Sequence, residues 1–555
     1  MIGDHIGQKV AGNGIPIMAL GMSLVAGEER RGEGASFRAF DPASGRSIGP
    51  AFYSASDLDV SDAVSSAARV FSEAPMSARL TVPLLRLVAQ LLEDSSEVVI
   101  ATCVAETGLS VSRLRGELGR TSSQLRFLAE VAERGERLDA TIDRGVFDGS
   151  TPELRKVRLP IGPVAVFGAS NFPLAFSVLG GDTASALAAG CPVVVKAHQA
   201  HPATSELCGR IMASAISQCG LDGGWFSLLQ GNGSSVGARL VQEPDISAVA
   251  FTGSLRGGRS LFDLAARRPN PVPVFAEMGS MNPVFVTRAA IQKRRTQIAL
   301  ELVGSIGGSA GQLCTKPGLI FVPDGPECDA FARDLSDAFE ARAAEYSLTS
   351  PIREMLATQF KLTSSIGGVE ILSQQSSGPD DPGLVIPGRL FRTNLAVFKE
   401  QPGLQIEHFG ASAILVACPE SELASVPRLL EGSLTGTIYL EPDDEGSVTE
   451  IVTGLARRIG RLVVNGVPTG VRVARGMHHG GPYPATTSAR DTSVGSASLD
   501  RFLRPVTFQD VPDGLLPLSL RDANPLGIVR LIDGNATDNP IDRSHARAST
   551  DGTEP

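Results

Sequence analysis

The 555-residue sequence has few aromatic residues, including one Trp and four Tyr, and no long run of basic residues. Its 50 Lys and Arg residues are outnumbered by 60 Asp and Glu residues, which gives a formal net charge of −10. Such a charge disfavours general binding to nucleic acids or to anionic membranes. The N-terminal apolar stretch, residues 10–26, is interrupted by glycines, too short to span a bilayer and only a weak signal-peptide candidate. We expect a soluble cytoplasmic protein.

The usual cysteine and histidine motifs are also missing. The seven cysteines are scattered without a CxxC pair, and the seven histidines include no HExxH. These absences argue against a disulfide framework and a zinc ribbon. The adjacent residues His478 and His479 do not place two ligands on one helical face. We therefore predict a reducing compartment and no metal site.

Glycine and proline, in contrast, are abundant, with 60 and 36 residues. From Pro163 onward, short apolar runs alternate with helical stretches, one of them predicted over residues 174–189. This alternation is typical of βαβ units and predicts an α/β fold with a doubly wound parallel sheet. A second α/β pattern begins near Gln292, and the segments 139–160 and 485–506 could be strands that leave the main body. Residues 1–35 and the last forty residues look loosely ordered.

Polar residues or glycines follow five successive predicted strands. Open parallel sheets bind ligands at the carboxyl ends of their strands, so this edge is the expected site. Each residue also has an ordinary structural explanation, such as a lysine at a sheet edge, a turn glycine or a capping carboxylate. No GxGxxG motif follows a strand. The five residues are Asn171, Lys196, Gly231, Ser254 and Glu277.

One cysteine, Cys314, lies in a glycine-rich segment, residues 307–317. A lone cysteine is more often an inert buried residue than a catalytic one. Small residues before it, however, would let a substrate and a cofactor approach the sulfur closely. Cys314 is therefore the candidate nucleophile.

Six runs of sequence together resemble the NAD(P)-dependent aldehyde dehydrogenase superfamily, in the order found in that family and over about residues 37–510. The runs are Phe167–Pro173, Val193–Lys196, Phe251–Ser254, Glu277–Pro283, Gly311–Thr315 and Glu407–Gly410. Two further runs, Lys196–Pro202 and Met477–Pro484, are similar to one branch of it. That branch holds the α-ketoglutaric semialdehyde (2,5-dioxopentanoate) dehydrogenases and the fatty aldehyde dehydrogenases of luminous bacteria.

The resemblance implies a fold with three parts, in a homodimer or homotetramer. A Rossmann-like cofactor domain would comprise residues 36–138 and 161–285, and an α/β catalytic domain residues 286–477. A β arm for oligomerisation would comprise residues 139–160 and 478–510. Residues 1–35 would then be an N-terminal extension and residues 511–555 a C-terminal tail.

The resemblance also implies a role for each matching residue. The Cys314 thiolate would attack the aldehyde carbon, Asn171 and the backbone N–H of Cys314 would stabilise the oxyanion, and Glu277 would activate the hydrolytic water. We expect NADP⁺ to be favoured and NAD⁺ to be possible, because Gln199 removes a carboxylate that would repel a 2′-phosphate. The cofactor residues would be Lys196, His198, Gln199, Gly231, Ser254, Glu407 and Phe409.

The expected reaction is oxidation of α-ketoglutaric semialdehyde to 2-oxoglutarate. Its carboxylate would need a guanidinium, so the candidate substrate residues are Gln124, Arg126, Phe172 and Arg490. A fatty aldehyde is the alternative substrate, with Phe172 and Phe176 lining an apolar tunnel. Transfer of the acyl group to CoA is disfavoured by Glu277. A catalytically silent binding or structural homologue is disfavoured by the complete set of Asn171, Glu277 and Cys314.

Overall fold

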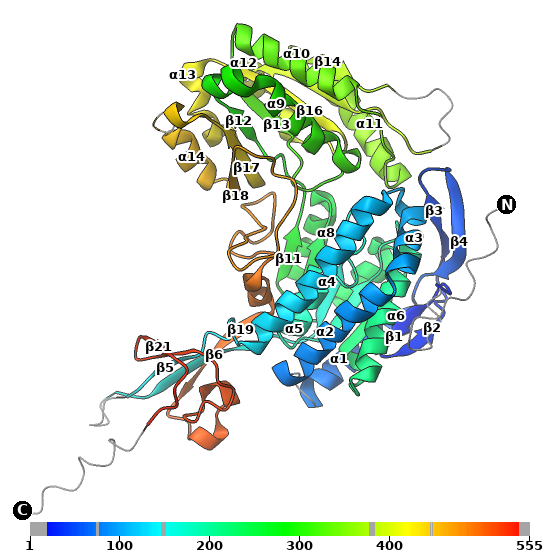
Figure 1. Cartoon of the computed structure of the whole chain (residues 1–555). Coiled ribbons are helices and arrows are strands. Elements are labelled where there is room, and N and C mark those ends of the chain that lie inside the picture. Colours follow the sequence, from blue (N-terminus) through cyan, green and yellow to red (C-terminus); the bar gives the residue numbers. More distant parts are fainter. Residues whose placement is uncertain are drawn as a thin grey trace, which may run out of the picture.

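The computed structural model describes residues 19–542 except 74–76, 146–150, 377–382, 445 and 447. Two α/β bodies, each built on a seven-stranded sheet, lie one above the other in Figure 1, and a smaller β arm projects from the lower one. The sheet of the lower body has the strand order β11-β10-β7-β8-β9-β1-β2. Its strands are β1 (Ser23–Val25), β2 (Glu28–Arg30), β7 (Val164–Phe167), β8 (Val193–Lys196), β9 (Phe226–Leu229), β10 (Ala248–Thr252) and β11 (Val274–Glu277).

The five strands from β11 to β9 pair in parallel, as the sequence pattern predicts. Both faces of this sheet are covered, which explains why each strand is an apolar run rather than an alternating one. In β7, for example, Val164 and Val166 pack into one hydrophobic core, whereas Ala165 and Phe167 pack into another on the opposite face. The helices of this body are α1 (Asp57–Glu73), α2 (Ala78–Asp94), α3 (Ser96–Thr107), α4 (Val111–Glu133), α5 (Gly181–Ala188), α6 (Pro202–Gln218), α7 (Ala238–Gln242) and α8 (Leu255–Ala266).

The upper body contains the second sheet, with the order β14-β15-β16-β13-β12-β17-β18. All of its pairings are parallel except that of β14 with β15. Its strands are β12 (Val284–Val286), β13 (Leu319–Pro323), β14 (Glu370–Gln374), β15 (Arg389–Asn394), β16 (Ser412–Cys418), β17 (Ser433–Tyr439) and β18 (Ile459–Val464). Its helices are α9 (Arg288–Gly307), α10 (Pro326–Glu340), α11 (Ser350–Ser364), α12 (Leu395–Glu400), α13 (Glu420–Leu423) and α14 (Thr449–Ala456).

The arm is a five-stranded sheet with the order β19-β6-β5-β20-β21. It joins strands from both segments that were expected to leave the main body and adds two from the C-terminal region. These strands are β5 (Thr141–Asp143), β6 (Leu154–Pro160), β19 (Leu503–Gln509), β20 (Arg530–Ile532) and β21 (Asn535–Thr537). A separate hairpin is formed by β3 (Ser36–Asp41) and β4 (Arg46–Tyr53).

Two expectations about the chain ends are wrong for the described residues. Near the N-terminus, β1 and β2 extend the first sheet, and the Glu206 carboxylate accepts hydrogen bonds from the backbone N–H groups of residues 20–22. Near the C-terminus, Leu516, Leu520 and Ile528 are buried in the arm's own core. Residues 1–18 and 543–555, which belong to the expected extension and tail, lie outside the described residues.

The helix predicted over residues 174–189 is shorter than expected. Residues 174–180 form turns, and α5 begins only at Gly181. The buried Glu117 carboxylate on α4 accepts hydrogen bonds from the backbone N–H groups of Leu174 and Ala175, at 2.8 and 3.0 Å. A side chain distant in sequence thus satisfies these donors, which no local propensity could indicate. Among the described residues, no helix is both long and apolar enough to cross a bilayer.

Candidate active site

The five predicted strand-end residues come to one edge of the first sheet. Lys196 is the last residue of β8 and Glu277 the last of β11, while Asn171, Gly231 and Ser254 follow β7, β9 and β10. Because these strands are parallel neighbours, their carboxyl ends share that edge.

The Cys314 loop follows α9 and has an unusual backbone. Ser309, Ala310 and Gly311 have φ angles of +54°, +55° and +68°, in the left-handed region. A Cβ on Gly311 would lie 2.2 Å from the backbone of Gly410, so only glycine fits there. Beyond this turn, the Asn282 side-chain amide donates to the carbonyls of Cys314 and Lys316, at 2.8 and 2.9 Å. The nucleophile therefore lies on a loop that is fixed on both sides.

Asn171 lies beside this loop, where an oxyanion donor is needed. Its Nδ2 donates to the backbone carbonyl of Gln312 at 2.9 Å, and the amide retains a second hydrogen. Arg113 on α4 donates to the backbone carbonyl of Asn171 at 2.6 Å. Gln312 is itself fixed, since its side chain contacts the backbone of Tyr346 and Leu348. Asn171 and Cys314 are thus held near each other, although they belong to different bodies of the molecule.

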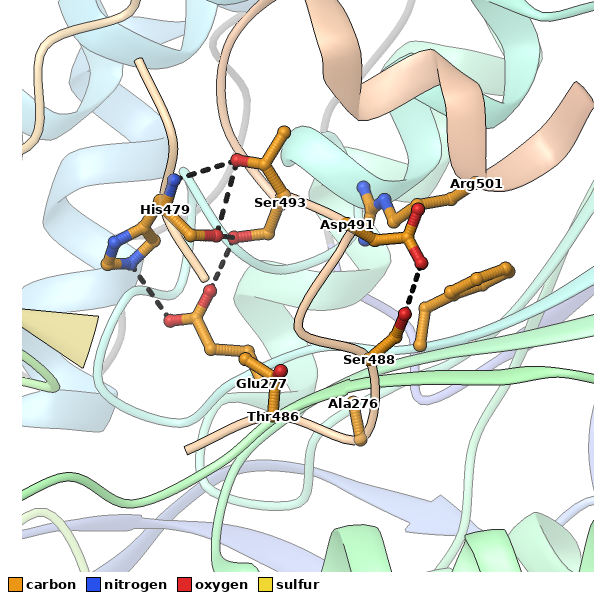
Figure 2. Close-up of a pocket in the computed structure, with 10 residues that line it drawn as sticks. Ala276, Glu277, His479, Thr486, Ser488, Asp491, Ser493 and Arg501 are labelled. Carbon is orange, nitrogen blue, oxygen red and sulfur yellow. Dashed lines mark hydrogen bonds and ion pairs between the residues drawn. The ribbon is translucent and has the colours of Figure 1, made fainter. Parts of the chain in front are cut away.

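Glu277 and Cys314 are bridged by His479, a residue without a predicted role. His479 Nε2 lies 2.9 Å from Glu277 Oε1 and 3.7 Å from Cys314 Sγ. Ser493 Oγ donates to the other carboxylate oxygen of Glu277 (Figure 2). His479 and Glu277 are almost fully buried. In the sequence, His479 lies in the run 477–484. That run is similar to one branch of the superfamily but indicated no role for this residue.

The electrostatics of this trio favour an ionised Glu277 and a protonated thiol. Burial alone raises the pKa of Glu277, but His479, Ser493 and Arg501 outweigh it and hold that pKa below its usual value. Burial raises the pKa of the Cys314 thiol well above its usual value, and the Glu277 and Glu407 carboxylates raise it further, whereas Arg120 lowers it. Forming the thiolate therefore requires a base or a compensating positive charge nearby.

A small cavity of about 20 Å³ lies beside Glu277 (Figure 2). This volume is enough for one water molecule. Its polar lining provides both donors and acceptors. The lining residues are Phe275, Ala276, Glu277, His479, Thr486, Ser488, Asp491, Thr492, Ser493 and Arg501.

Donor atoms of Glu277, Cys314 and His479 lie within 4.8 Å of one another, as the ligands of a metal ion would. The same three groups also suit thiol chemistry, with Cys314 as the candidate nucleophile, Glu277 as the candidate base and His479 between them. We therefore assign no metal to this trio.

The predicted cofactor residues are spread along the same edge. Lys196 is buried, and its Nζ lies 3.5 Å from the Gly231 carbonyl, which leaves donors for a bound group. His198 is half-buried and accepts a hydrogen bond from the backbone N–H of Ala200, whereas Gln199 is exposed. Ser254 caps α8 and is exposed. These donors fit the hydroxyl and phosphate groups of a dinucleotide.

Glu407 and Phe409 reach this region from the second body, where both are half-buried. Glu407 Oε2 lies 2.2 Å from the point that a Cβ on Gly279 would occupy, so a side chain there would displace the Glu407 carboxylate. Burial raises the pKa of Glu407 to about 7, although Lys316 opposes the shift. Lys316 was not predicted. Its Nζ donates to the Ser412 carbonyl at 2.6 Å, and burial lowers its pKa to about 8.

Of the predicted substrate residues, one arginine is paired with a carboxylate of the chain and another is exposed. Arg126 makes a bidentate ion pair with Glu93, at 2.5 and 2.7 Å, on the half-exposed side of α4. Arg490 is exposed. On the same helix, the terminal guanidinium nitrogen atoms of Arg120, six residues earlier, are buried. Its guanidinium lies over the Phe176 ring at 4.8 Å.

The other two predicted substrate residues lie in the interior. Gln124 is buried, and its Oε1 has no hydrogen-bond partner in the described part of the chain. Phe172 packs edge-on against Phe176, with ring centroids 5.3 Å apart, and Arg113 lies over its face at 4.9 Å. Phe172 thus lies beside both an aromatic ring and a cationic group.

A cysteine thiol, a side-chain amide and a carboxylate beside a dinucleotide-type sheet edge are the groups expected of a thiol-dependent oxidoreductase. The model of the aldehyde dehydrogenase family matches residues 30–354, and the chain belongs to that family. Its members oxidise aldehydes to carboxylic acids with NAD(P)⁺, and this chain is such an enzyme.

Two curated relatives are similar over most of the chain. Alpha-ketoglutaric semialdehyde dehydrogenase 2 of Azospirillum brasilense is 43% identical over 525 residues, which are 93% of this chain and 99% of the relative. The alpha-ketoglutaric semialdehyde dehydrogenase of Acinetobacter baylyi is 43% identical over 446 residues, 78% of this chain and 83% of the relative.

Solved structures share the fold at lower identity. Betaine aldehyde dehydrogenase of Staphylococcus aureus, in complex with NAD⁺, is 18% identical with a TM-score of 0.77 and covers 89% of this chain and 98% of its own. A putative aldehyde dehydrogenase of Burkholderia cenocepacia is 21% identical with a TM-score of 0.75, over 88% of this chain and 99% of its own.

Proposed function

We propose that this chain oxidises a short aldehyde that bears a carboxylate, specifically α-ketoglutaric semialdehyde, to 2-oxoglutarate. The observation that carries the proposal is the 43% identity, over 93% of the chain, to a relative named for that substrate. The half-buried arginines near Cys314 support it, because a carboxylate that leaves water needs a paired cation.

The first half of the reaction uses Cys314, His479 and Asn171. The thiol proton leaves Sγ for His479 Nε2, 3.7 Å away, and the resulting imidazolium is stabilised by Glu277 at 2.9 Å. The sulfur then bonds to the aldehyde carbon, and the carbonyl oxygen becomes an oxyanion beside the Asn171 amide. When bound, the nicotinamide accepts the hydride, which leaves a thioester on Cys314.

The second half uses Glu277 and water. The Glu277 carboxylate accepts a proton from water as the water oxygen bonds to the thioester carbon. The carbon–sulfur bond then breaks, so that the acid leaves and the thiolate is regenerated. The cavity beside Glu277 can hold one such water. This arrangement favours hydrolysis over acyl transfer to CoA.

The fatty aldehyde alternative is disfavoured by charge. Phe172 and Phe176 could line an apolar tunnel, but Arg113 and Arg120 lie over their faces, at 4.9 and 4.8 Å. A long alkyl chain would have to desolvate these guanidinium groups without pairing them.

NADP⁺ is the proposed preferred cofactor, with NAD⁺ also accepted. Burial lowers the pKa of Lys196 only to about 8, so its ammonium remains mostly charged at neutral pH. Burial lowers the pKa of His198 well below its usual value, so His198 offers a neutral ring rather than a second cation. Gln199 brings no negative charge. A strong preference for NAD⁺ in kcat/KM would overturn this assignment.

The arm is the proposed oligomerisation element. It projects from the first body (Figure 1), and β19 lies at one edge of its sheet with unpaired backbone groups. Light scattering coupled to size exclusion tests this proposal, which predicts a homodimer or homotetramer and is overturned by a monomer.

The substrate proposal is tested by comparing kcat/KM for α-ketoglutaric semialdehyde and decanal, with both nucleotides. We expect the oxo acid to be preferred, and a preference for decanal would overturn the proposal. Cys314→Ala should abolish turnover. Glu277→Gln should retain a slowed initial burst of reduced nucleotide and then stall, because acylation uses Glu277 only to stabilise the imidazolium, whereas hydrolysis needs it as the base.

A further inference from the structure

Two half-buried arginines with buried guanidinium nitrogen atoms, Arg120 on α4 and Arg461 on β18, approach Cys314 from different elements. Each has an electrostatic interaction with the Cys314 sulfur. Among the described residues, no carboxylate lies within ion-pair distance of either guanidinium. A buried, unpaired guanidinium is costly, because it has lost its hydration without gaining a counter-ion. Its presence therefore calls for an anion from outside the chain.

Arg120 is anchored through its Nε atom, whereas its two terminal nitrogen atoms have no partner among the described residues. Its Nε donates to the carbonyl of Val471 at 3.3 Å, and its guanidinium lies over the Phe176 ring. Both Nη1 and Nη2 are buried without a hydrogen-bond partner. These two nitrogen atoms form the edge that binds a carboxylate bidentately.

Arg461 approaches the same short segment from the second body. Its Nη1 donates to the Gly470 carbonyl at 3.0 Å, and its Nη2 donates to the Pro468 carbonyl. Its Nε is buried without a partner. The carbonyls of residues 468–471 thus fix both guanidinium groups, and each retains at least one donor.

A third arginine, Arg113, is already occupied. It donates to the Asn171 carbonyl at 2.6 Å and lies 3.7 Å from Glu117. Its positive charge is therefore paired directly. Arg120 has only the longer-range attraction of Glu117 and Glu277, and neither Arg120 nor Arg461 has an ion-pair partner among the described residues.

We propose that Arg120 binds the carboxylate at the far end of the aldehyde substrate and that Arg461 supplies a second positive charge to the same carboxylate. The inference rests on the proposed function and names the residues that give it its specificity. The substrate's aldehyde carbon would then lie at Cys314 while its carboxylate pairs with Arg120, so the molecule is bound at both ends. In this proposal Arg120 takes the role that the sequence suggested for Arg126 and Arg490.

The test is Arg120→Met, which retains the apolar contact with Phe176 and removes the charge. We expect kcat/KM for α-ketoglutaric semialdehyde to fall about 100-fold, mainly through KM, since a buried charge-assisted pair is lost. The dissociation constant of 2-oxoglutarate, measured by calorimetry, should rise by a similar factor. Arg120→Lys should recover part of the loss. Arg461→Met should show a smaller change in the same direction.

Pentanal and Arg126→Met are the controls. Pentanal has the same chain length without the carboxylate, so its kcat/KM should fall far less in Arg120→Met. Arg126 lies on the same helix but is paired with Glu93, so Arg126→Met should behave as wild type.

The outcomes separate the two proposals. If wild type prefers pentanal to the oxo acid, the proposed function fails. If wild type prefers the oxo acid but Arg120→Met lowers activity equally with both substrates, Arg120 acts on the Cys314 thiolate and the carboxylate assignment is overturned. Unchanged binding of 2-oxoglutarate in Arg120→Met would overturn it as well.

Discussion

His479 is the residue whose replacement tests the proposed proton path most directly. In His479→Gln, Glu277 loses its 2.9 Å partner, and Cys314 loses the nitrogen 3.7 Å from its sulfur. A hydrogen bond to a buried charged group contributes about 1.5–3 kcal/mol. At about 1.4 kcal/mol per pKa unit, the pKa of Glu277 should rise by about one to two units.

The expected result is a shift of the acid limb of the kcat profile. His479 helps to hold the pKa of Glu277 below its usual value, and the base must be ionised to act. Removing His479 raises that pKa, so the acid limb should move to higher pH by about one to two units. Cys314 also loses the ring nitrogen that would accept its proton, so alkylation of Cys314 by iodoacetamide at neutral pH should slow by about tenfold.

His478→Gln provides the matched control. His478 is adjacent and half-buried but has no hydrogen bond or ion pair to Cys314 or Glu277 in the described structure. An unmoved acid limb together with an unchanged alkylation rate in His479→Gln would refute the proton path.

Three further predictions concern the cofactor, the nucleophile loop and the arm. Because burial raises the pKa of Glu407 to about 7, the KM for the nucleotide should fall as pH rises through 7, and Lys316→Met should move that transition to higher pH; a pH-independent KM would contradict this. Asn282→Ala leaves the carbonyls of Cys314 and Lys316 without their donor, so thermal unfolding should show a loss of about 2–4 kcal/mol and the burst amplitude should fall. Truncation after Asp510 removes Leu520 and Asp522, the partners of the buried Arg155. The truncated chain should therefore aggregate or unfold at a lower temperature, because donors of a buried guanidinium then lack partners. An unchanged Tm would show that this packing is dispensable.

Much of the fold could be predicted because it depends on local periodicity. The parallel strands of the first sheet are apolar runs buried on both faces, and turns rich in glycine separate them from helices. The sites at their carboxyl ends follow from the same pattern, since parallel neighbours must end at one edge. That argument located Asn171, Lys196 and Glu277 without any contact information.

The remaining features depend on contacts between distant segments. His479 comes within reach of Cys314 and Glu277 only because the chain returns from the second body toward the end of β11. The sequence of α4 does not show which arginine faces inward, because Arg120 and Arg126 are not distinguished by residue type. The chain ends were misjudged for a similar reason, since short polar strands gain their stability from the sheets that they join.

The turn before Cys314 has a consequence for engineering. Ser309 and Ala310 hold left-handed backbone angles that cost an L-residue about 1 kcal/mol each relative to glycine. Replacing either with glycine would relieve that cost in the native state but would also increase the entropy of the unfolded chain and loosen the loop. At these two positions the strained backbone accompanies a rigid loop around the sulfur. The two effects of glycine on stability oppose each other, so turnover should respond to the substitution more than thermal stability does.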